Sequence, residues 1–237
     1  MKSMWTIALT ALVIFPVAAR ADLITGVLNF TGTANISLGT IGFDNNVFSI
    51  NGPADTQQGG FMALAGTTGT IQNLTNPPDA TGPLNVVDFM TFDAAPNITI
   101  TLTFLIPGIN GAAGCAAFPA ASGQVCTPDQ PDQSPFNLQN TSSTSSTASF
   151  NILGTEVDSL TGQTVDLTGA FTTPFTNQNF QQLLATIGSG GTITTPFSAQ
   201  FSTVPEPSTL IELMMGIGLV GISRWRTVKR RKNTGLA

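Results

Sequence analysis

A two-residue period of apolar and polar side chains runs through the middle of the chain, from Asn97 to Ile106. One face carries only apolar side chains, namely Ile98, Ile100, Leu102, Phe104 and Ile106, and the other carries Asn97, Thr99, Thr101 and Thr103. Successive side chains of an extended strand point to opposite faces. The segment therefore predicts a half-buried β-strand.

Weaker forms of this alternation predict nine further strands, separated by clusters of Gly, Pro, Asn and Asp. They are Ile24–Phe30, Ile36–Ile41, Val47–Ile50, Phe61–Leu64, Thr70–Leu74, Val86–Phe92, Ala148–Leu153, Thr164–Phe171 and Ile193–Phe201. Many short strands at this spacing predict an all-β fold, namely an antiparallel β-sandwich of the jelly-roll or Ig-like type, or a related antiparallel barrel. We assign this domain to residues 22–203.

Two other segments have less regular patterns. Apolar residues recur every three or four positions from Asn177 to Ile187, which predicts one short helix. The run of Ser and Thr from Thr141 to Thr147 is either an exposed connection or the start of a polar edge strand leading into Phe150. Because this domain has no Lys, its sheet edges would have to be protected by Pro, Gly and Asp.

Positive charge is confined to the two ends of the chain. Residues 22–223 contain no Lys or Arg, whereas all 13 Asp and Glu lie in that range. Binding to a phosphate backbone needs Lys or Arg to displace counterions. We therefore expect no nucleic-acid partner.

The composition also restricts catalysis. The chain has no His, so an imidazole base, a Ser-His or Cys-His nucleophile and the commonest zinc ligand are all missing. Only paired carboxylates remain as catalytic groups. The closest in sequence are Asp88 with Asp93, Asp129 with Asp132, and Glu156 with Asp158, of which the last pair would share one face of a strand. Solvated acids that keep the domain soluble are the simpler interpretation, so we predict no enzymatic activity and no cofactor.

Two cysteines, Cys115 and Cys126, lie close together in a segment rich in Gly and Ala. A closely spaced pair in an exported chain indicates a disulfide. Closing so small a loop contributes about 3 kcal/mol in the chain-entropy model. A metal pair or a reactive thiol is the alternative, although no His or further Cys is present to complete a metal site.

Two kinds of binding site stay open on the sequence alone. Asp44–Asn46 and Asp129–Asp132 offer oxygen donors for calcium, although neither has the ligand spacing of an EF-hand loop. Exposed aromatic rings could contact carbohydrate, and the candidates are Phe61, Phe118 and Phe136. We assign no metal ligand.

The N-terminus has the parts of a secretory signal peptide. Lys2 precedes an apolar stretch from Ile7 to Val17, and Ala19-Arg20-Ala21 follows as a small-x-small cleavage site. The apolar stretch is too short to span a bilayer and contains Pro16. Residues 1–21 are therefore predicted to be removed during export, with cleavage before Asp22.

The C-terminus combines three features in a fixed order. The motif Val204–Ser208 should be extended, because Pro205 and Pro207 disfavour helix before them. Residues 209–223 form an apolar segment, predicted to be a transmembrane helix, and residues 224–232 form a basic stop that stays cytoplasmic. The cationic residues of this stop are Arg224, Arg226, Lys229, Arg230, Arg231 and Lys232.

Residues 204–237 resemble the C-terminal sorting domain of the PEP-CTERM family of exported bacterial proteins. The match covers the motif with Pro205, Glu206 and Pro207, the glycine-spaced apolar stretch, and the basic cluster. The resemblance implies recognition by an exosortase, a membrane transpeptidase of Gram-negative bacteria that also make exopolysaccharide. Glu212 departs from the uninterrupted apolar helix of the family and should weaken insertion without abolishing it.

Together these features predict an exported protein that is held at the inner membrane as a precursor. Removal of the tail would then place it at the cell surface or in the extracellular matrix of a biofilm, where exopolysaccharide is a candidate partner. The alternatives are an exported module that binds carbohydrate or calcium, and a glycoside hydrolase or lyase that uses carboxylates. The resemblance covers only the tail, so it says nothing about residues 22–203.

Overall fold

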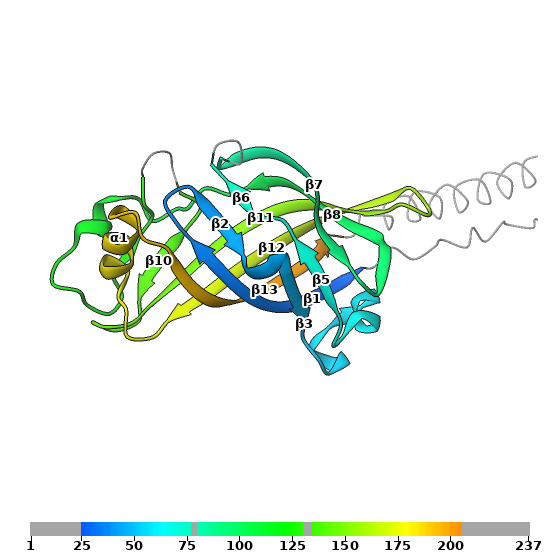
Figure 1. Cartoon of the computed structure of the whole chain (residues 1–237), viewed down its shortest axis with the longest axis horizontal. Helices are drawn as coiled ribbons and strands as arrows, with labels where there is room; N and C mark the ends of the chain where they lie inside the picture. The colour runs from blue at the N-terminus through cyan, green and yellow to red at the C-terminus, as the bar shows by residue number, and fades with distance from the viewer. Residues whose placement is uncertain (1–24, 77–79, 130–133, 205–237) are drawn as a thin grey trace, which may run out of the picture.

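The computed structural model describes residues 25–76, 80–129 and 134–204, and the side chain of Asp55 is not described. Within these residues the chain forms thirteen β-strands, one α-helix and four short 3-10 helices. Figure 1 shows a long barrel with helix α1 (Phe180–Gly188) at one end and the ends of the described chain at the other. The prediction of an all-β fold with one short helix is confirmed.

Eight antiparallel strands close the barrel in the order in which they occur along the chain. They are β1 (Gly26–Ile36), β3 (Val47–Ile50), β5 (Thr68–Ile71), β7 (Gly82–Phe92), β8 (Ala95–Leu105), β11 (Ser146–Asp158), β12 (Gln163–Phe175) and β13 (Ile193–Val204). Strand β13 pairs with β1 from Val27↔Ser202 to Ile36↔Ile193, which joins the last strand to the first. The architecture is an up-and-down barrel.

Short elements extend or interrupt the barrel strands. Strand β2 (Thr40–Phe43) precedes β3 and is separated from it by the 3-10 helix η1 (Asp44–Asn46), and β6 (Leu74–Thr75), which pairs with β2, continues the line of β5. Strand β10 (Asn137–Asn140) pairs with the first residues of β11 beyond the end of β8, and β9 (Val125–Cys126) pairs with β10. The other short elements are η2 (Ala54–Thr56), β4 (Gln58–Gly59), η3 (Gly60–Leu64) and η4 (Ala113–Ala116).

Phenylalanine rings fill the middle of the barrel. Phe30 lies with its ring centroid 5.0 Å from those of Phe48 and Phe201, and Phe171 stacks on Phe150 at 4.5 Å. Such offset and edge-to-face pairs each stabilise a core by about 0.5–1.5 kcal/mol beyond the area they bury. A second, smaller cluster of buried residues lies under α1 and includes Phe175, Phe180, Leu183 and Ile193. The middle of the barrel is therefore filled by packed side chains.

The structure corrects three details of the predicted fold. The sheet closes on itself, so the related antiparallel barrel describes it better than a sandwich of two separate sheets. Phe61–Leu64 is part of the 3-10 helix η3, with Phe61 and Leu64 buried. In β8 the burial alternates through Ile98, Ile100 and Leu102 but then shifts to Leu105.

A β-bulge explains the shift in β8. Leu153 pairs with Phe104, whereas the next residue, Gly154, pairs with Leu102, so Thr103 has no place in the ladder. An extra residue in one strand reverses the faces of all side chains beyond it. Phe104 consequently does not share the inward face with Leu102, although the sequence period predicts that it does.

The two less regular segments also have a defined structure. The helix begins at Phe180, three residues after the predicted start, and ends at Gly188. The Ser/Thr run forms the turn between β10 and β11, where Thr141 N donates to Ser145 O, and its last two residues begin β11. Of the two alternatives for this run, the exposed connection describes most of it.

Candidate functional site

A cavity of about 290 Å³ lies at the end of the barrel that α1 covers. The cavity lies between the barrel strands and the smaller core cluster under the helix. Most of its lining is aliphatic or aromatic, namely Ile36, Leu38, Ile41, Leu74, Leu105, Phe136, Leu138, Ala148, Phe175, Leu183, Leu184, Ile187 and Ile193. The polar side chains in the lining are those of Ser37, Thr40, Asn76, Thr81 and Ser134.

Helix α1 forms one wall of the cavity because its sequence fixes both its start and its buried face. Asn179 caps the helix by accepting a hydrogen bond from Gln182 N at 3.0 Å, and Gln182 Oε1 accepts one from Asn179 N at 3.1 Å. This reciprocal capping box satisfies two backbone donors at the helix start. Leu183 and Ile187, four residues apart, then face the cavity.

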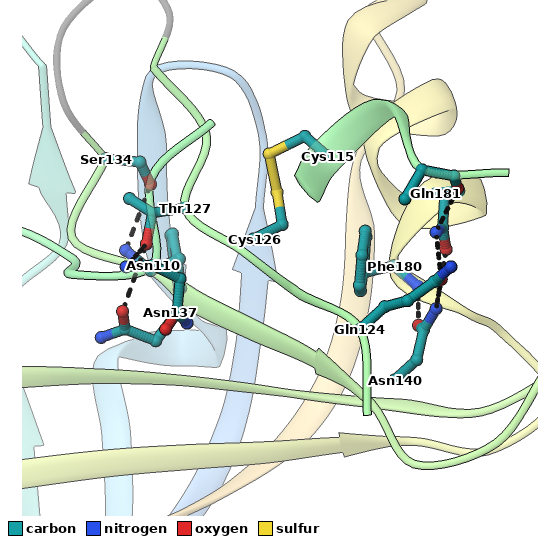
Figure 2. The surroundings of a disulfide bond; sticks show 12 residues. Asn110, Cys115, Gln124, Cys126, Thr127, Ser134, Asn137, Asn140, Phe180 and Gln181 are labelled. Atoms are coloured by element: carbon teal, nitrogen blue, oxygen red, sulfur yellow. Dashed lines mark hydrogen bonds between the residues drawn. A yellow bond between two sulfur atoms is a disulfide. The ribbon is translucent and has the colours of Figure 1, made fainter. Parts of the chain in front are cut away.

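A buried amide network ties α1 to the strands beneath it (Figure 2). The side chain of Asn140, fully buried at 0 % exposure, accepts from Phe180 N at 2.9 Å and donates to Gln124 Oε1 and Gln181 Oε1. Gln181 Nε2 donates in turn to Ala117 O at 2.9 Å. Because buried amides are costly unless they are hydrogen-bonded, this network holds the helix in one position.

The disulfide between Cys115 and Cys126 adds a covalent link to the same region (Figure 2). Cys115 lies on η4 and Cys126 lies on β9, with their Cα atoms 4.9 Å apart. The predicted disulfide is thereby confirmed, and both cysteines pack with the cluster under α1. We call η4, β9 and α1, which cover this end of the barrel, the cap. The disulfide, the amide network and the apolar cluster under α1 together hold the cap in place.

Glu156 and Asp158 do share one face of β11, as their spacing predicts, and both are buried. Glu156 lies inside the barrel beside Ile100 and Val165, its paired residues on the two neighbouring strands. Asp158 lies where β11 ends, at the end of the barrel opposite the cavity. Neither carboxylate lines the cavity.

Asp158 has a structural role in the turn between β11 and β12. Its carboxylate accepts hydrogen bonds from Asn97 Nδ2 at 3.0 Å, Leu160 N at 2.9 Å and Thr161 Oγ1 at 2.8 Å. These donors, with Asn97 the strongest, hold the pKa of Asp158 below its usual value. An acid that is kept ionised by a tight turn stabilises that turn and is a poor proton donor.

The other predicted acidic pairs are not gathered in a cleft. Asp88 is exposed within β7, and Asp93 is exposed in the turn after it, where it accepts a hydrogen bond from the Thr68 hydroxyl. Asp129 is exposed, and Asp132 lies outside the described residues. None of the three described acids lines the cavity.

The calcium and carbohydrate candidates are also dispersed. Asp44, Asn45 and Asn46 form the exposed helix η1, where Asn45 donates to the Asp44 carboxylate at 3.2 Å. Among the described residues, no group of three or more His, Cys, Asp and Glu side chains could hold a metal ion. Of the aromatic candidates, Phe61 is buried and Phe136 packs against both core clusters.

Phe118 alone of the predicted aromatic contacts is solvent-exposed, at 92 % of its surface. The predicted signal peptide, the Pro-Glu-Pro motif, the transmembrane helix and the basic stop all lie outside the described residues. In the part of the chain that the structure describes, no helix combines the length and the apolarity needed to cross a membrane.

Sequence reasoning missed the cavity. Its lining comes from segments as distant as Ile36 and Ile193, which the closing pair of strands brings together. The apolar face of the predicted helix, with Leu183, Leu184 and Ile187, is the one feature of the site that the sequence period revealed. Comparison of the chain with protein-family models, with curated proteins and with solved structures finds no match.

Proposed function

We propose that this chain is an exported, non-enzymatic protein of the cell surface or extracellular matrix, sorted by an exosortase through its C-terminal motif. The observation that carries the proposal is the distribution of charge and motif along the chain. Every Lys and Arg lies either at positions 2 and 20 or within positions 224–232, and the Pro-Glu-Pro motif separates the domain from the apolar segment. A chain built in this way can be exported, anchored by its end and then trimmed.

The position of the motif relative to the barrel supports the proposal. Strand β13 ends at Val204, directly before Pro205, whose missing N–H cannot continue the ladder. The barrel strands are complete at that residue, since β13 pairs with both β1 and β12. Cleavage of the chain after the motif would therefore leave the barrel intact.

Dispersed acids support the non-enzymatic part of the proposal. Exposed carboxylates lie on η1, β7 and β12, and the two buried ones lie away from the cavity. Hydrolysis by two carboxylates needs them about 5–10 Å apart on either side of the bond to be cut. Glu156 and Asp158 share one face of β11, but both are buried and neither lines the cavity. Incubation of the purified chain with surface polysaccharides should leave every bond intact, whereas cleavage that a single Asp or Glu substitution abolishes would refute this part.

Two changes to the tail test the sorting step. Deletion of residues 210–237 should release soluble protein into the periplasm, because the membrane anchor is lost. Replacement of Pro205, Glu206 and Pro207 by alanine should leave an uncleaved precursor in the membrane. Both outcomes are measured by fractionation and by mass spectrometry of the intact chain.

A matched control changes three residues of the same tail outside the motif. Alanine at Asn233, Thr234 and Gly235 should leave sorting unchanged, since these residues follow the basic cluster. If the surface form of the wild-type protein still carries residues 224–232, the proposed processing does not occur.

A further inference from the structure

The cavity at the α1 end has walls that are already in place. Disulfide Cys115–Cys126 and the hydrogen bonds of Asn140 fix the cap, and the capping box at Asn179 fixes the start of α1. A preformed pocket loses little conformational entropy when a ligand enters it. The cavity is thus preformed, because the elements that surround it are held in place, and it is suited to binding a small molecule.

One side of the cavity is accessible to a molecule arriving from solvent. Leu38, in the connection between β1 and β2, lines the cavity and is 61 % exposed. An apolar side chain that both borders a cavity and remains in water marks a place where apolar surface can still be covered. Leu184 and Ile187 of α1 are only partly buried and lie on the same lining.

The charge of the chain disfavours anionic ligands. The side chains of Ser37, Thr40, Asn76 and Ser134 give the lining hydroxyl and amide groups, and no Lys, Arg or His occurs from residue 22 to residue 223. Asp129, next to the lining residue Pro128, adds negative charge nearby. An anionic head group would lose its hydration here without gaining a cationic partner, which is costly.

We propose that this cavity binds a small, neutral, apolar molecule that carries a hydroxyl or carbonyl group at one end. The apolar part lies against Leu183, Ile187 and Ile193, and the polar end meets the hydroxyl and amide side chains of the lining. A volume of about 290 Å³ is at the lower end of the range of ligand pockets, which favours a single short chain or a small ring system over a lipid with two long chains. This ligand class is independent of the sorting proposal, because it depends on residues 36–193 alone.

A photoreactive pair of probes tests both the place and the charge preference. The neutral probe is a medium-chain alcohol with a diazirine in its chain, and the matched anionic probe is the corresponding carboxylic acid at pH 8. Each is irradiated with the full chain, and labelled peptides are located by mass spectrometry. Chymotrypsin is the protease of choice, because trypsin has no site between Arg20 and Arg224.

The alcohol probe should label peptides that contain Ser37–Ile41 and Leu183–Ile187. The concentration of 1-decanol that halves this labelling should be at least tenfold lower than the corresponding concentration of decanoate. Because labelled peptides are identified individually, labelling at the cavity can be distinguished from labelling of the C-terminal tail or of lipid. Equal labelling by the two probes would refute the neutral preference. Labelling spread evenly along the barrel would refute the site itself.

Variants with added volume complete the test. Ala148, buried on β11, lines the cavity, so Ala148→Leu should reduce labelling at least fivefold by filling it. Leu184→Trp fills the same space from the helix and should act similarly if Ala148→Leu fails to fold. Ala185→Leu adds the same volume on the exposed side of α1 and should label like wild type. Unchanged labelling in both filled variants, each folded by circular dichroism, would overturn the proposal.

Discussion

Individual glycines make room for the phenylalanine rings that fill the barrel. Gly169 on β12 pairs with Phe201 on β13, and a Cβ at this glycine would lie 2.4 Å from Phe201 Cε1 and 2.8 Å from Ile152 Cγ1. We expect Gly169→Ala to lower the free energy of unfolding by about 1–3 kcal/mol, because the extra methyl overpacks a filled core. Chemical denaturation of the two proteins, monitored by circular dichroism, measures the difference.

A glycine with open space around it provides the control. A Cβ at Gly188, the last residue of α1, would meet no atom within 4 Å. Gly188→Ala should therefore cause no loss of stability and can even add up to about 1 kcal/mol. If both substitutions cost the same, the packing of Phe201 against Gly169 is not what makes the glycine necessary.

Asp158 should make stability depend on acid pH. Asn97, Leu160 N and Thr161 hold its pKa below the usual value near 4, so the unfolded chain takes up the proton first as the pH falls. The stabilisation is complete above about pH 4 and is lost as the pH falls through the lower pKa of the folded state. Melting temperatures of wild type and Asp158→Asn between pH 2 and 7 should converge at the acid end.

Removal of the main donor to Asp158 gives an independent check. Asn97→Ala should move the acid loss of stability to higher pH than in wild type, because the pKa of Asp158 in the folded protein rises towards its unfolded value. If the melting temperature of Asn97→Ala is instead lower than that of wild type by the same amount at every pH, Asn97 contributes only packing.

At the scale of elements, the cap of the barrel depends on the cross-link between η4 and β9. The bond closes a separation of 11 residues, for which the chain-entropy model gives about 3 kcal/mol. We expect Cys115→Ala with Cys126→Ala to lose roughly that amount and to increase hydrogen exchange at Phe180 N and Gly123 N, whose partners lie at the cap. Exchange near Gly26 of β1 and near Val204 of β13, at the end of the barrel opposite α1, should change less.

The same elements show what the sequence could predict. Alternation located most strands, because period-two burial is a local property of residues such as Ile98, Ile100 and Leu102. It failed at Phe104, since a bulge is set by the pairing with β11, and at Phe61, since two buried residues three apart also fit a 3-10 turn. Strand β10 was missed because Asn137–Asn140 has Leu138 as its one apolar residue and so shows no alternation of apolar and polar side chains.

For the molecule as a whole, closure solves a problem that the composition creates. A sheet without Lys lacks the usual protection against edge-to-edge pairing. The pairing of β13 with β1 removes the two edges of the main sheet, and it joins residues about 170 positions apart, such as Phe30 and Ala199. No local pattern contains that contact, so periodicity could not decide between a sandwich and a closed barrel, and it could not locate the cavity.

In the membrane-anchored precursor that we propose, closure of the barrel also fixes which end of the domain faces the membrane. Gly26 N donates to Thr203 Oγ1 at 2.8 Å, so the described chain starts and ends side by side, at the end opposite α1 (Figure 1). The turn between β11 and β12, which contains Leu160, lies near this end, because Asp166 of β12 pairs with Val204. Leu38 lines the cavity at the other end. Strand β11 has 13 residues, which places the two ends about 30 Å apart after allowing for strand tilt.

Fluorophores at the two ends test this orientation in the proposed precursor. Both native cysteines are in the disulfide, so Leu160→Cys and Leu38→Cys each add one reactive thiol at an exposed position. Residues 205–208 can span at most about 14 Å when extended, which is less than the length of the barrel. In membranes that carry a quencher on the lipid head groups, the label at position 160 should therefore be quenched more strongly than the label at position 38. Equal quenching would mean that the tail does not hold the α1 end of the barrel away from the membrane.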